Sequence, residues 1–114
     1  ELMLNGQRQI ILHGIVKIPY LMNGETMNYK FNEDKNLQEL KAYVDATYSE
    51  HYASDKYQAT DVIIDSGHGE GFAMGNIMKY AKRYGNKEGK NKKDLFKILH
   101  YAIIMLDVHD TENS

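Results

Sequence analysis

The sequence has no cysteine, no tryptophan and a single proline. The absence of cysteine excludes disulfide bonds, thiolate zinc sites and thiol catalysis. It also fits a cytoplasmic location, which we expect for this chain. No apolar run approaches the roughly 18 to 20 residues that cross a bilayer, so the sequence predicts no membrane partner.

Charge is distributed unevenly along the chain. The 114 residues carry a net charge of -2, yet eight of the fourteen basic residues and only two acidic residues fall between Lys79 and Lys97. This segment is therefore strongly positive within a mildly acidic chain. Such asymmetry indicates a localised anionic partner, most simply one that bears phosphate.

The length and composition predict a single folded domain over residues 1–114. Asn23-Gly24 is a hairpin-turn signal, which predicts a β-hairpin of residues 8–22 and 25–31, or a three-stranded meander if residues 2–4 join it. Helical periodicity follows this β-rich part. We therefore predict an α+β fold, in which a hairpin or meander within residues 1–34 packs on about four helices within residues 35–110. The predicted helices cover about 36–50, a short stretch from 59 or 60 to 65, 71–84, and a last helix that begins at 91 or 92.

Local signals define the ends of these elements. Pro19 cannot donate a ladder hydrogen bond, so we expect it at a sheet edge or a bulge. Gly85 is the natural C-terminal stop of the helix at 71–84. Asp94 is expected either to cap the last helix or to pair with Arg83. Residues 51–57 are polar and aromatic and are predicted to form a loop.

The predicted helix at 71–84 has two sides. Arg83 offers a forked donor matched to phosphate oxygens, Lys79 supplies a point charge, and Asn76 can donate and accept towards a base or sugar. The complete polar face is Asn76, Lys79 or Tyr80, Arg83 and Lys87. The apolar stripe, which we expect to pack in the core, is Met74, Ile77, Met78, Ala81 and Tyr84.

Glycines lead into this helix. Near Gly69, Gly71 and Phe72, the helix N-terminus would offer unpaired backbone N–H groups and the positive end of the helix dipole to an anion. The alternative is that Gly71 and Gly75 only permit tight helix packing and that the lysines form a solvated face.

The sequence lacks the usual machinery for moving a phosphate. The glycine-rich stretch has no Gly-Lys-Ser/Thr ending of a Walker A loop. Asp61, Asp65 and Glu70 could hold Mg²⁺ in a kinase, although such acids are more often caps or part of a solvated face. The five histidines lack the spacing of a metal site. We therefore expect no metal and no cofactor, with Mg²⁺ required only by a kinase.

Aromatic and histidine side chains could contact a nucleotide. Tyr52 and Tyr80 are the leading candidates to stack on a nucleobase. His51 and His68 could contact the ligand or act as a general acid or base, because histidine titrates near neutral pH. The alternative for each histidine is that it lies in a loop and forms a hydrogen bond with the backbone. The other stacking candidates are Tyr57, Phe72, Tyr84 and Tyr101.

Residues from about 51 to 106 carry a recognisable pattern. Its members are His51-Tyr52, Gly71-Phe72, Gly75-Asn76, Lys79-Tyr80, Arg83, Lys87, Asp94-Leu95, Lys97 and Tyr101. This pattern resembles the DUF3310 family of small phage proteins, which includes the nucleotide kinase of T7-like phages. The chain departs from the family at Ser49-Glu50, where a proline-type lead-in is usual, and at His100, where a tryptophan is usual. The resemblance implies a nucleotide ligand and a phage protein in host cytoplasm, but it does not transfer catalysis.

Three functions are compatible with these patterns. The first is capture of a phosphate-bearing nucleotide, as a sponge that sequesters a host immune signal such as a cyclic nucleotide. The alternatives are a nucleoside monophosphate kinase and a nucleic-acid-binding module, although the net charge disfavours long nucleic acid. The broad apolar surface of the last helix also suggests a homo-oligomer. The predicted ligand-binding residues are His51, Tyr52, Gly69, Gly71, Phe72, Asn76, Lys79, Tyr80, Arg83 and Lys87.

Overall fold

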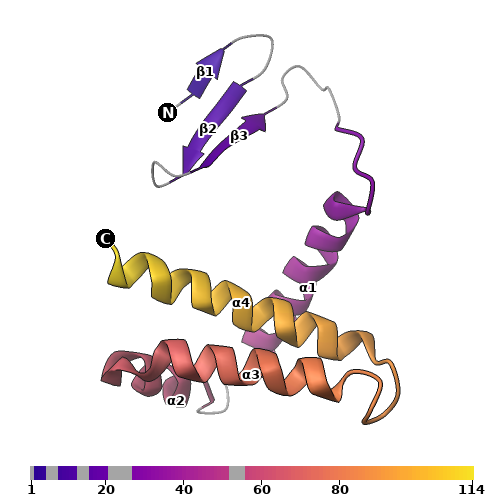
Figure 1. The fold of residues 1–114 in the computed structure, drawn as a ribbon, viewed down its shortest axis with the longest axis vertical. Helices are drawn as coiled ribbons and strands as arrows, with labels where there is room; N and C mark the ends of the chain where they lie inside the picture. Colours follow the sequence, from indigo (N-terminus) through magenta and orange to yellow (C-terminus); the bar gives the residue numbers. More distant parts are fainter. Residues whose placement is uncertain (1, 5–7, 13–15, 21–26, 52–55) are drawn as a thin grey trace. The chain divides into compact units, whose positions relative to one another are not determined.

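The structure, a computed structural model of the 114-residue chain, divides into two compact units, Glu1–Asp34 and Lys35–Ser114. The strands lie in the first unit and almost all helical residues lie in the second (Figure 1). The prediction of a single domain stays a prediction. The residues described are 2–4, 8–12, 16–20, 27–51 and 56–114, with side chains described for 27–50 and 59–114.

The N-terminal unit contains a three-stranded antiparallel sheet in the order β1-β2-β3. Pro19 lies in β3, opposite Gln9 of β2. Because β3 lies at an edge of the described sheet, the predicted edge position of Pro19 is confirmed. The strands are β1 (Leu2–Leu4), β2 (Arg8–Leu12) and β3 (Val16–Tyr20).

The predicted hairpin of residues 8–22 and 25–31 is wrong. Two separate strands occupy the first of these stretches, and residues 27–32 contain no strand. Asn32 has a left-handed φ of 55°, and the Phe31 N–H donates to Glu33 Oε1 at 2.8 Å. These features end the extended chain and begin a helix. The predicted turn at Asn23-Gly24 lies outside the described residues.

The regular elements of residues 33–114 are all helical in the part of the chain that the structure describes. They are α1 (Glu33–His51), α2 (Lys56–Ile63), a π-helical turn η1 (Ile64–His68), α3 (Gly69–Arg83) and α4 (Lys92–Glu112). The chain is therefore predominantly helical. The predicted α+β class, with a hairpin or meander packed on about four helices, is wrong, because most of the residues that the structure describes are helical.

Two helix ends lie where the sequence signals indicate. The Asn91 side chain accepts a hydrogen bond from the Lys93 N–H at 2.9 Å and caps α4, which confirms the predicted start. Gly85, with φ 83°, directly follows the C-cap residue of α3 and confirms the predicted stop. The two signals fix the connection between α3 and α4.

The glycine-rich segment that leads into α3 is not an open loop. Gly69 and Gly71 belong to α3 itself, and the residues before them form η1. Gly67 has φ 92° and interrupts the helical path, a conformation that glycine adopts without steric penalty. The loop predicted at 51–57 is also wrong at both ends, because α1 includes His51 and α2 already begins at Lys56.

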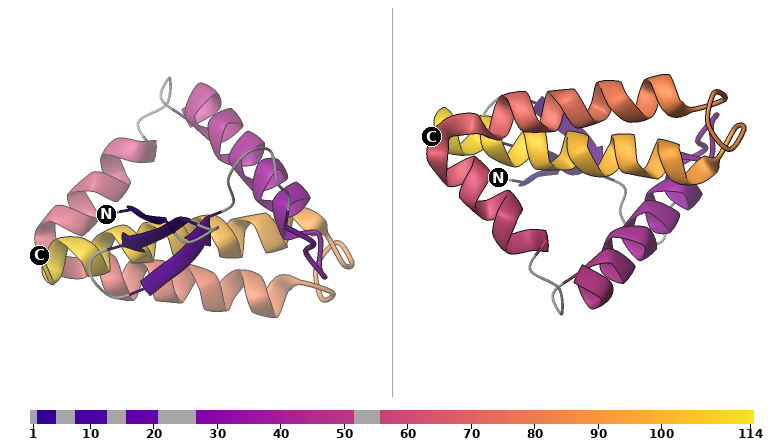
Figure 2. Two further views of the ribbon diagram at one scale, coloured as in Figure 1. Left: turned by 90° about the horizontal axis from the view of Figure 1, so that it is seen from above. Right: turned by 90° about the horizontal axis from the view of Figure 1, so that it is seen from below.

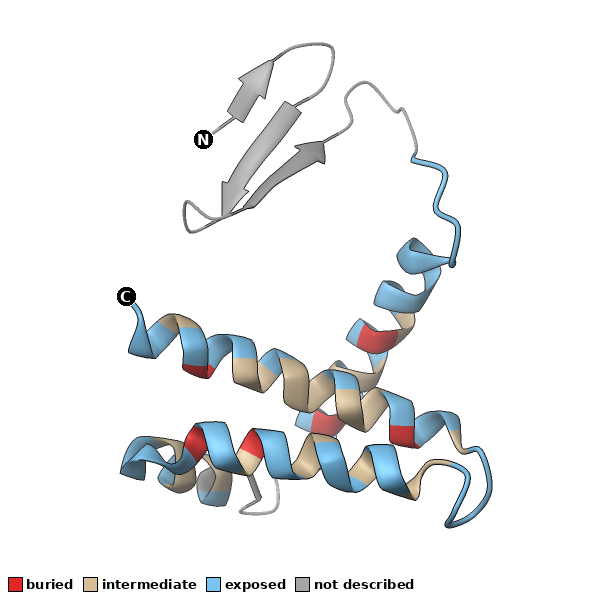
Figure 3. Cartoon of the chain, in the orientation of Figure 1, coloured by how far each residue is buried: buried red, intermediate tan, exposed pale blue. Residues whose placement is uncertain are grey.

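Helices α3 and α4 lie side by side and form the most extensive contact of the helical unit (Figures 1 and 2). Ala73 of α3 is fully buried and Val108 of α4 is 5% exposed. Figure 3 shows buried positions on both helices. A Cβ added to Gly69 would lie 3.0 Å from Val108 Cγ2. Small residues therefore allow the two helices to approach closely.

The core side of α3 differs from the prediction. Met74 and Met78 are 46% and 64% exposed, and Ala81 is exposed as well, although all three were expected in the core. The buried residues of α3 are Gly69 and Ala73. Apolar periodicity alone could not separate the two sides, because a glycine and an alanine contribute little to a hydrophobic stripe but permit the closest packing.

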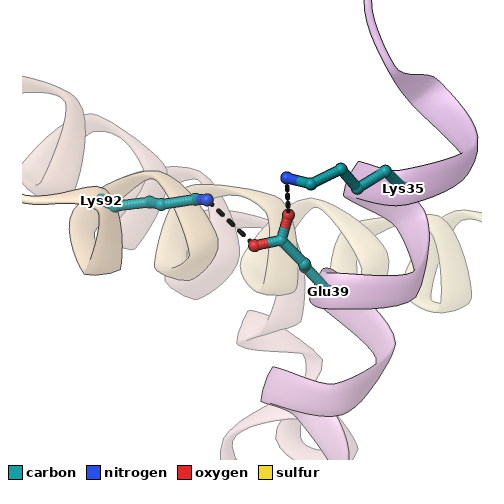
Figure 4. Close-up of polar contacts among 3 residues, drawn as sticks. All are labelled: Lys35, Glu39 and Lys92. Atoms are coloured by element: carbon teal, nitrogen blue, oxygen red, sulfur yellow. Dashed lines mark hydrogen bonds and ion pairs between the residues drawn. The ribbon is translucent and has the colours of Figure 1, made fainter.

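Helix α1 contacts α4 through its middle. The rings of Tyr43 and Phe96 stack with centroids 5.4 Å apart and planes 15° apart. Glu39 accepts hydrogen bonds from Lys35 Nζ at 2.8 Å and from Lys92 Nζ of α4 at 3.0 Å (Figure 4). These two bonds hold the pKa of Glu39 below its usual value.

Candidate ligand-binding site

Five side chains from α3 and α4 form a group that we call the cation–aromatic cluster: Lys79, Tyr80, Arg83, Lys97 and Tyr101. The rings of Tyr80 and Tyr101 stack, with centroids 6.1 Å apart and planes 13° apart. Three cationic groups surround Tyr80. Lys79 Nζ lies 4.5 Å from the ring centroid, Lys97 Nζ lies 5.5 Å from it, and Arg83 Cζ lies 5.9 Å from it.

Helical spacing brings the cluster together. Tyr80 and Arg83 are three residues apart on α3, and Lys97 and Tyr101 are four apart on α4, so each pair shares one helix face. Phe72, two turns before Tyr80, meets Tyr101 edge to face with centroids 5.8 Å apart. The predicted ligand face of α3 thus lies along α4, with Tyr80 and Arg83 half-buried and Lys79 exposed.

Arg83 is held between two acidic side chains. Its Nε lies 3.6 Å from Asp94 Oδ1, and its Nη2 lies 3.6 Å from Glu88 Oε2. The Asp94 side chain is only 6% exposed, and this contact confirms Asp94 as the partner of Arg83. Arg83 Nε and Asp94 Oδ2 are buried without a hydrogen-bond partner. These ion pairs are longer than direct hydrogen bonds, so the guanidinium retains donor capacity.

Lys97 remains a cation at neutral pH. Burial lowers the pKa of Lys97, but a hydrogen bond with Tyr43 and electrostatic interactions with Tyr43, Tyr80 and Tyr101 outweigh this effect, so the pKa lies above its usual value. The opposing effects leave a positive charge fixed between α1, α3 and α4. An anion bound beside Tyr80 would meet this charge without a change in protonation.

The connection between α3 and α4 is an ordered basic loop. Gly85 and Gly89 adopt positive φ angles of 83° and 69°, and the Gly85 N–H donates to the Gly89 carbonyl at 2.9 Å. The Lys87 N–H donates to the Arg83 carbonyl at 3.0 Å. Within the described residues, four exposed lysines at this end of the helix pair make no ion pair: Lys82, Lys87, Lys90 and Lys93.

The predicted glycines divide into two kinds. Gly69 is buried against Val108, so it serves the packing of α3 on α4. Gly71 and Gly75 are exposed, and a Cβ added to either would meet nothing within 4 Å. Tight packing within the described unit therefore does not explain Gly71 or Gly75. It explains Gly69 alone.

Other predicted residues lie farther from the cluster or outside the description. The Asn76 side chain donates to the Phe72 carbonyl at 2.9 Å, which leaves its own carbonyl oxygen to accept. His51 is the last residue of α1, and its side chain lies outside the described part of the structure, as does Tyr52. Lys87 lies in the basic loop, where it is exposed.

The predicted ligand-binding residues did not include Lys97, Tyr101 or Asp94, although Tyr101 was a stacking candidate and Asp94 a possible partner of Arg83. Lys97 and Tyr101 both belong to the family-like pattern, and their spacing of four residues puts them on one face of α4. Combining that pattern with the position of Arg83 on α3 would have found them. The burial of Asp94 depends on helix packing and had no signal in the sequence.

Two kinds of site are not found among the described residues. No group of three or more histidine, cysteine, aspartate or glutamate side chains there could hold a metal ion, and Asp61, Asp65 and Glu70 are all exposed. None of the described helices has the length and apolar character of a membrane span.

Comparison with known proteins identifies one family. A family model described as a protein of unknown function, DUF3310, matches residues 46–103, just over half of the chain. The match covers the end of α1, all of α3 and the cation–aromatic cluster. No curated protein and no solved structure matches the chain. On the family match, the chain belongs to the DUF3310 family.

Proposed function

We propose that this protein binds a phosphate-bearing nucleotide at the cation–aromatic cluster and holds it without chemical change. The observation that carries the proposal is the convergence of three cationic groups on the Tyr80 ring, which is itself stacked on Tyr101. A nucleotide has the two complementary parts, an anionic phosphate and an aromatic base.

The phosphate would be bound by the cations. Arg83 presents a planar fork that matches phosphate oxygens, and its two carboxylate contacts at 3.6 Å are long enough for a phosphate to compete with them. Lys79 is exposed and supplies a point charge beside the same ring. Lys87 and Lys90, the unpaired lysines of the basic loop, add a positive field that attracts an anion to this end of α3 and α4.

The base would be held by the aromatic residues. Tyr80 is half-buried, so part of its surface is available, and Tyr101 supports it from α4. Gly75 is exposed on α3 one turn before Lys79, and its missing side chain leaves the helix backbone open to close approach. These features favour a small ligand that lies along α3.

Capture is favoured over phosphoryl transfer. A kinase needs carboxylates that hold Mg²⁺ beside the phosphates. The two carboxylates near the described cluster, Asp94 and Glu88, both contact Arg83. A protein that binds a nucleotide and leaves it intact would act as a sponge, for example for a cyclic nucleotide immune signal in a phage-infected host. The resemblance to a phage nucleotide kinase keeps the nucleoside monophosphate kinase as the second candidate.

Titration calorimetry with a panel of nucleoside monophosphates, nucleoside triphosphates and cyclic dinucleotides tests binding. Lys79→Ala and Arg83→Lys should each weaken binding about 10-fold or more, since one charge-assisted contact contributes about 1.5 to 3 kcal/mol. Lys82→Ala is the matched control, because Lys82 carries the same charge on α3 but lies outside the cluster. Equal losses for all three variants would indicate nonspecific charge attraction and reject the site.

Recovery of the ligand separates capture from catalysis. Heat denaturation of the complex should release the nucleotide unchanged, as judged by chromatography and mass. Phosphorylated or hydrolysed products, formed in wild type and lost in Arg83→Lys, would instead establish the kinase. Binding of duplex or single-stranded nucleic acid with a steep salt dependence, in the absence of nucleotide binding, would favour the third function.

A further inference from the structure

Helix α4 carries an exposed apolar stripe with regular spacing. Its members are Leu95, Leu99, Ile103 and Leu106, which are 41%, 44%, 42% and 63% exposed. Steps of four, four and three residues keep them on one side of the helix. Asp94, Tyr101 and Val108, which belong to the contact with α3, lie on the opposite side. The stripe is therefore separate from the cation–aromatic cluster.

The small core of the helical unit suggests that another surface covers this stripe. Among the described hydrophobic residues, only Leu40, Ala73 and Val108 are buried. Four large aliphatic side chains in one row on a helix of 21 residues make a contiguous apolar surface of the kind that marks an interaction site. Singly scattered exposed leucines would need no explanation.

The charges of α4 indicate what covers it. Lys92, which pairs with Glu39, and Lys93 occupy the first turn together with Asp94, which is buried beside Arg83. At the other end, Asp107, Asp110 and Glu112 follow the stripe, with His109 among them. This order opposes the helix dipole, which favours anions at the N-terminus and cations at the C-terminus. An antiparallel second α4 would bring the basic end of one helix beside the acidic end of the other.

The stripe is also nearly symmetric about residue 101. An antiparallel second copy centred there places its Leu106 beside Leu95 of the first copy and its Ile103 beside Leu99. The reverse pairs form as well, because the two copies are identical. Reciprocal pairing of this kind is the requirement for a two-fold interface between identical chains. We propose that two copies of this chain associate through an antiparallel contact between their α4 helices. The proposal does not depend on nucleotide binding.

Sedimentation velocity over a dilution series of the full chain tests the association. Wild type should be a dimer. Leu106→Glu should raise the dimer dissociation constant about 30-fold or more, the scale of an interface hot spot. Met78→Glu is the matched control, because Met78 is 64% exposed on α3 and should leave the dimer intact. A monomeric wild type, including one whose stripe is covered by residues 1–34, overturns the proposal.

Charge-reversal variants and cross-linking test whether the two α4 helices run antiparallel. Asp107→Lys should weaken the dimer by facing basic residues of the partner, and adding Lys93→Glu should restore it. Because the chain has no cysteine, single cysteines give a clean readout. A mixture of Leu95→Cys and Leu106→Cys proteins should form a mixed disulfide under mild oxidation. Leu95→Cys alone should not, because its two copies would lie roughly 17 Å apart along the axis, beyond the roughly 7 Å Cα limit. A Leu95→Cys homodimer disulfide overturns the antiparallel arrangement.

Discussion

Helix α4 makes two contacts of different character. Against α3 it buries small side chains and one carboxylate beside the ring stack of Tyr80 on Tyr101: Ala73 is fully buried, and Asp94 is 5% exposed. Against α1 it presents a ring stack, Tyr43 on Phe96, and an ion pair from Lys92 to Glu39 whose side chains are 62% and 35% exposed. Buried, closely packed contacts resist local opening, whereas exposed ion pairs contribute little. The α3–α4 pair is therefore the rigid support of the cluster, and α1 is its more weakly attached neighbour.

The largest expected difference between the two contacts comes from overpacking. Ala73→Leu inserts a large side chain between α3 and α4, where no space is left, and should lower the free energy of unfolding by about 3 kcal/mol. Ala46→Leu makes the same change at an exposed position of α1 and should alter stability little. Urea unfolding followed by circular dichroism measures both. Equal effects would remove the distinction between the contacts.

A smaller effect should distinguish the glycines of α3. Gly69→Ala would press a methyl group against Val108 Cγ2 at 3.0 Å and should destabilise the protein despite the better helix propensity of alanine. Gly75→Ala enters open space and should stabilise it by about 0.5 to 1 kcal/mol. Thermal unfolding of the two variants should therefore shift in opposite directions. A stabilised Gly69→Ala would mean that α3 and α4 approach less closely than described.

The smallest expected effect concerns the contact with α1. The pKa of Glu39 is lowered by hydrogen bonds from Lys35 and Lys92, so its contribution to stability is present above the pKa of the unfolded chain and is lost as pH falls through the lower folded pKa. Glu39→Gln should reduce the loss of stability that occurs as the pH falls below 5. The midpoint of urea unfolding at each pH measures this loss. Glu50→Gln, at an exposed position of the same helix, should leave this pH dependence unchanged. An unaltered profile in Glu39→Gln would show that the ion pairs do not persist in solution.

Local signals in the sequence predicted the ends of α3 and α4 because they act over a few residues. Asn91 caps its own helix, and Gly85 supplies the positive φ that ends α3. The pairing of Asp94 with Arg83 was also accessible, since only a short loop separates the two helices. These features depend on residues that are close together in the sequence.

The features that sequence did not predict depend on tertiary packing. Helix α3 has apolar residues on one side and small residues on the other, and only contact with α4 selects the side of Gly69 and Ala73. The same choice turned Tyr80 towards α4, where its ring stacks on Tyr101. The strand pattern of residues 8–22 likewise left open where one strand ends and the next begins.

The most direct test of the proposed nucleotide site is mass spectrometry of the small molecules released by heat from protein purified out of cells. Wild type and Lys82→Ala should release a nucleotide at a constant molar ratio to protein, whereas Lys79→Ala and Arg83→Lys should release much less while keeping the same circular dichroism spectrum. Equal nucleotide content in all four proteins, or a purified wild type that neither carries nor binds any nucleotide of the panel, would contradict the account.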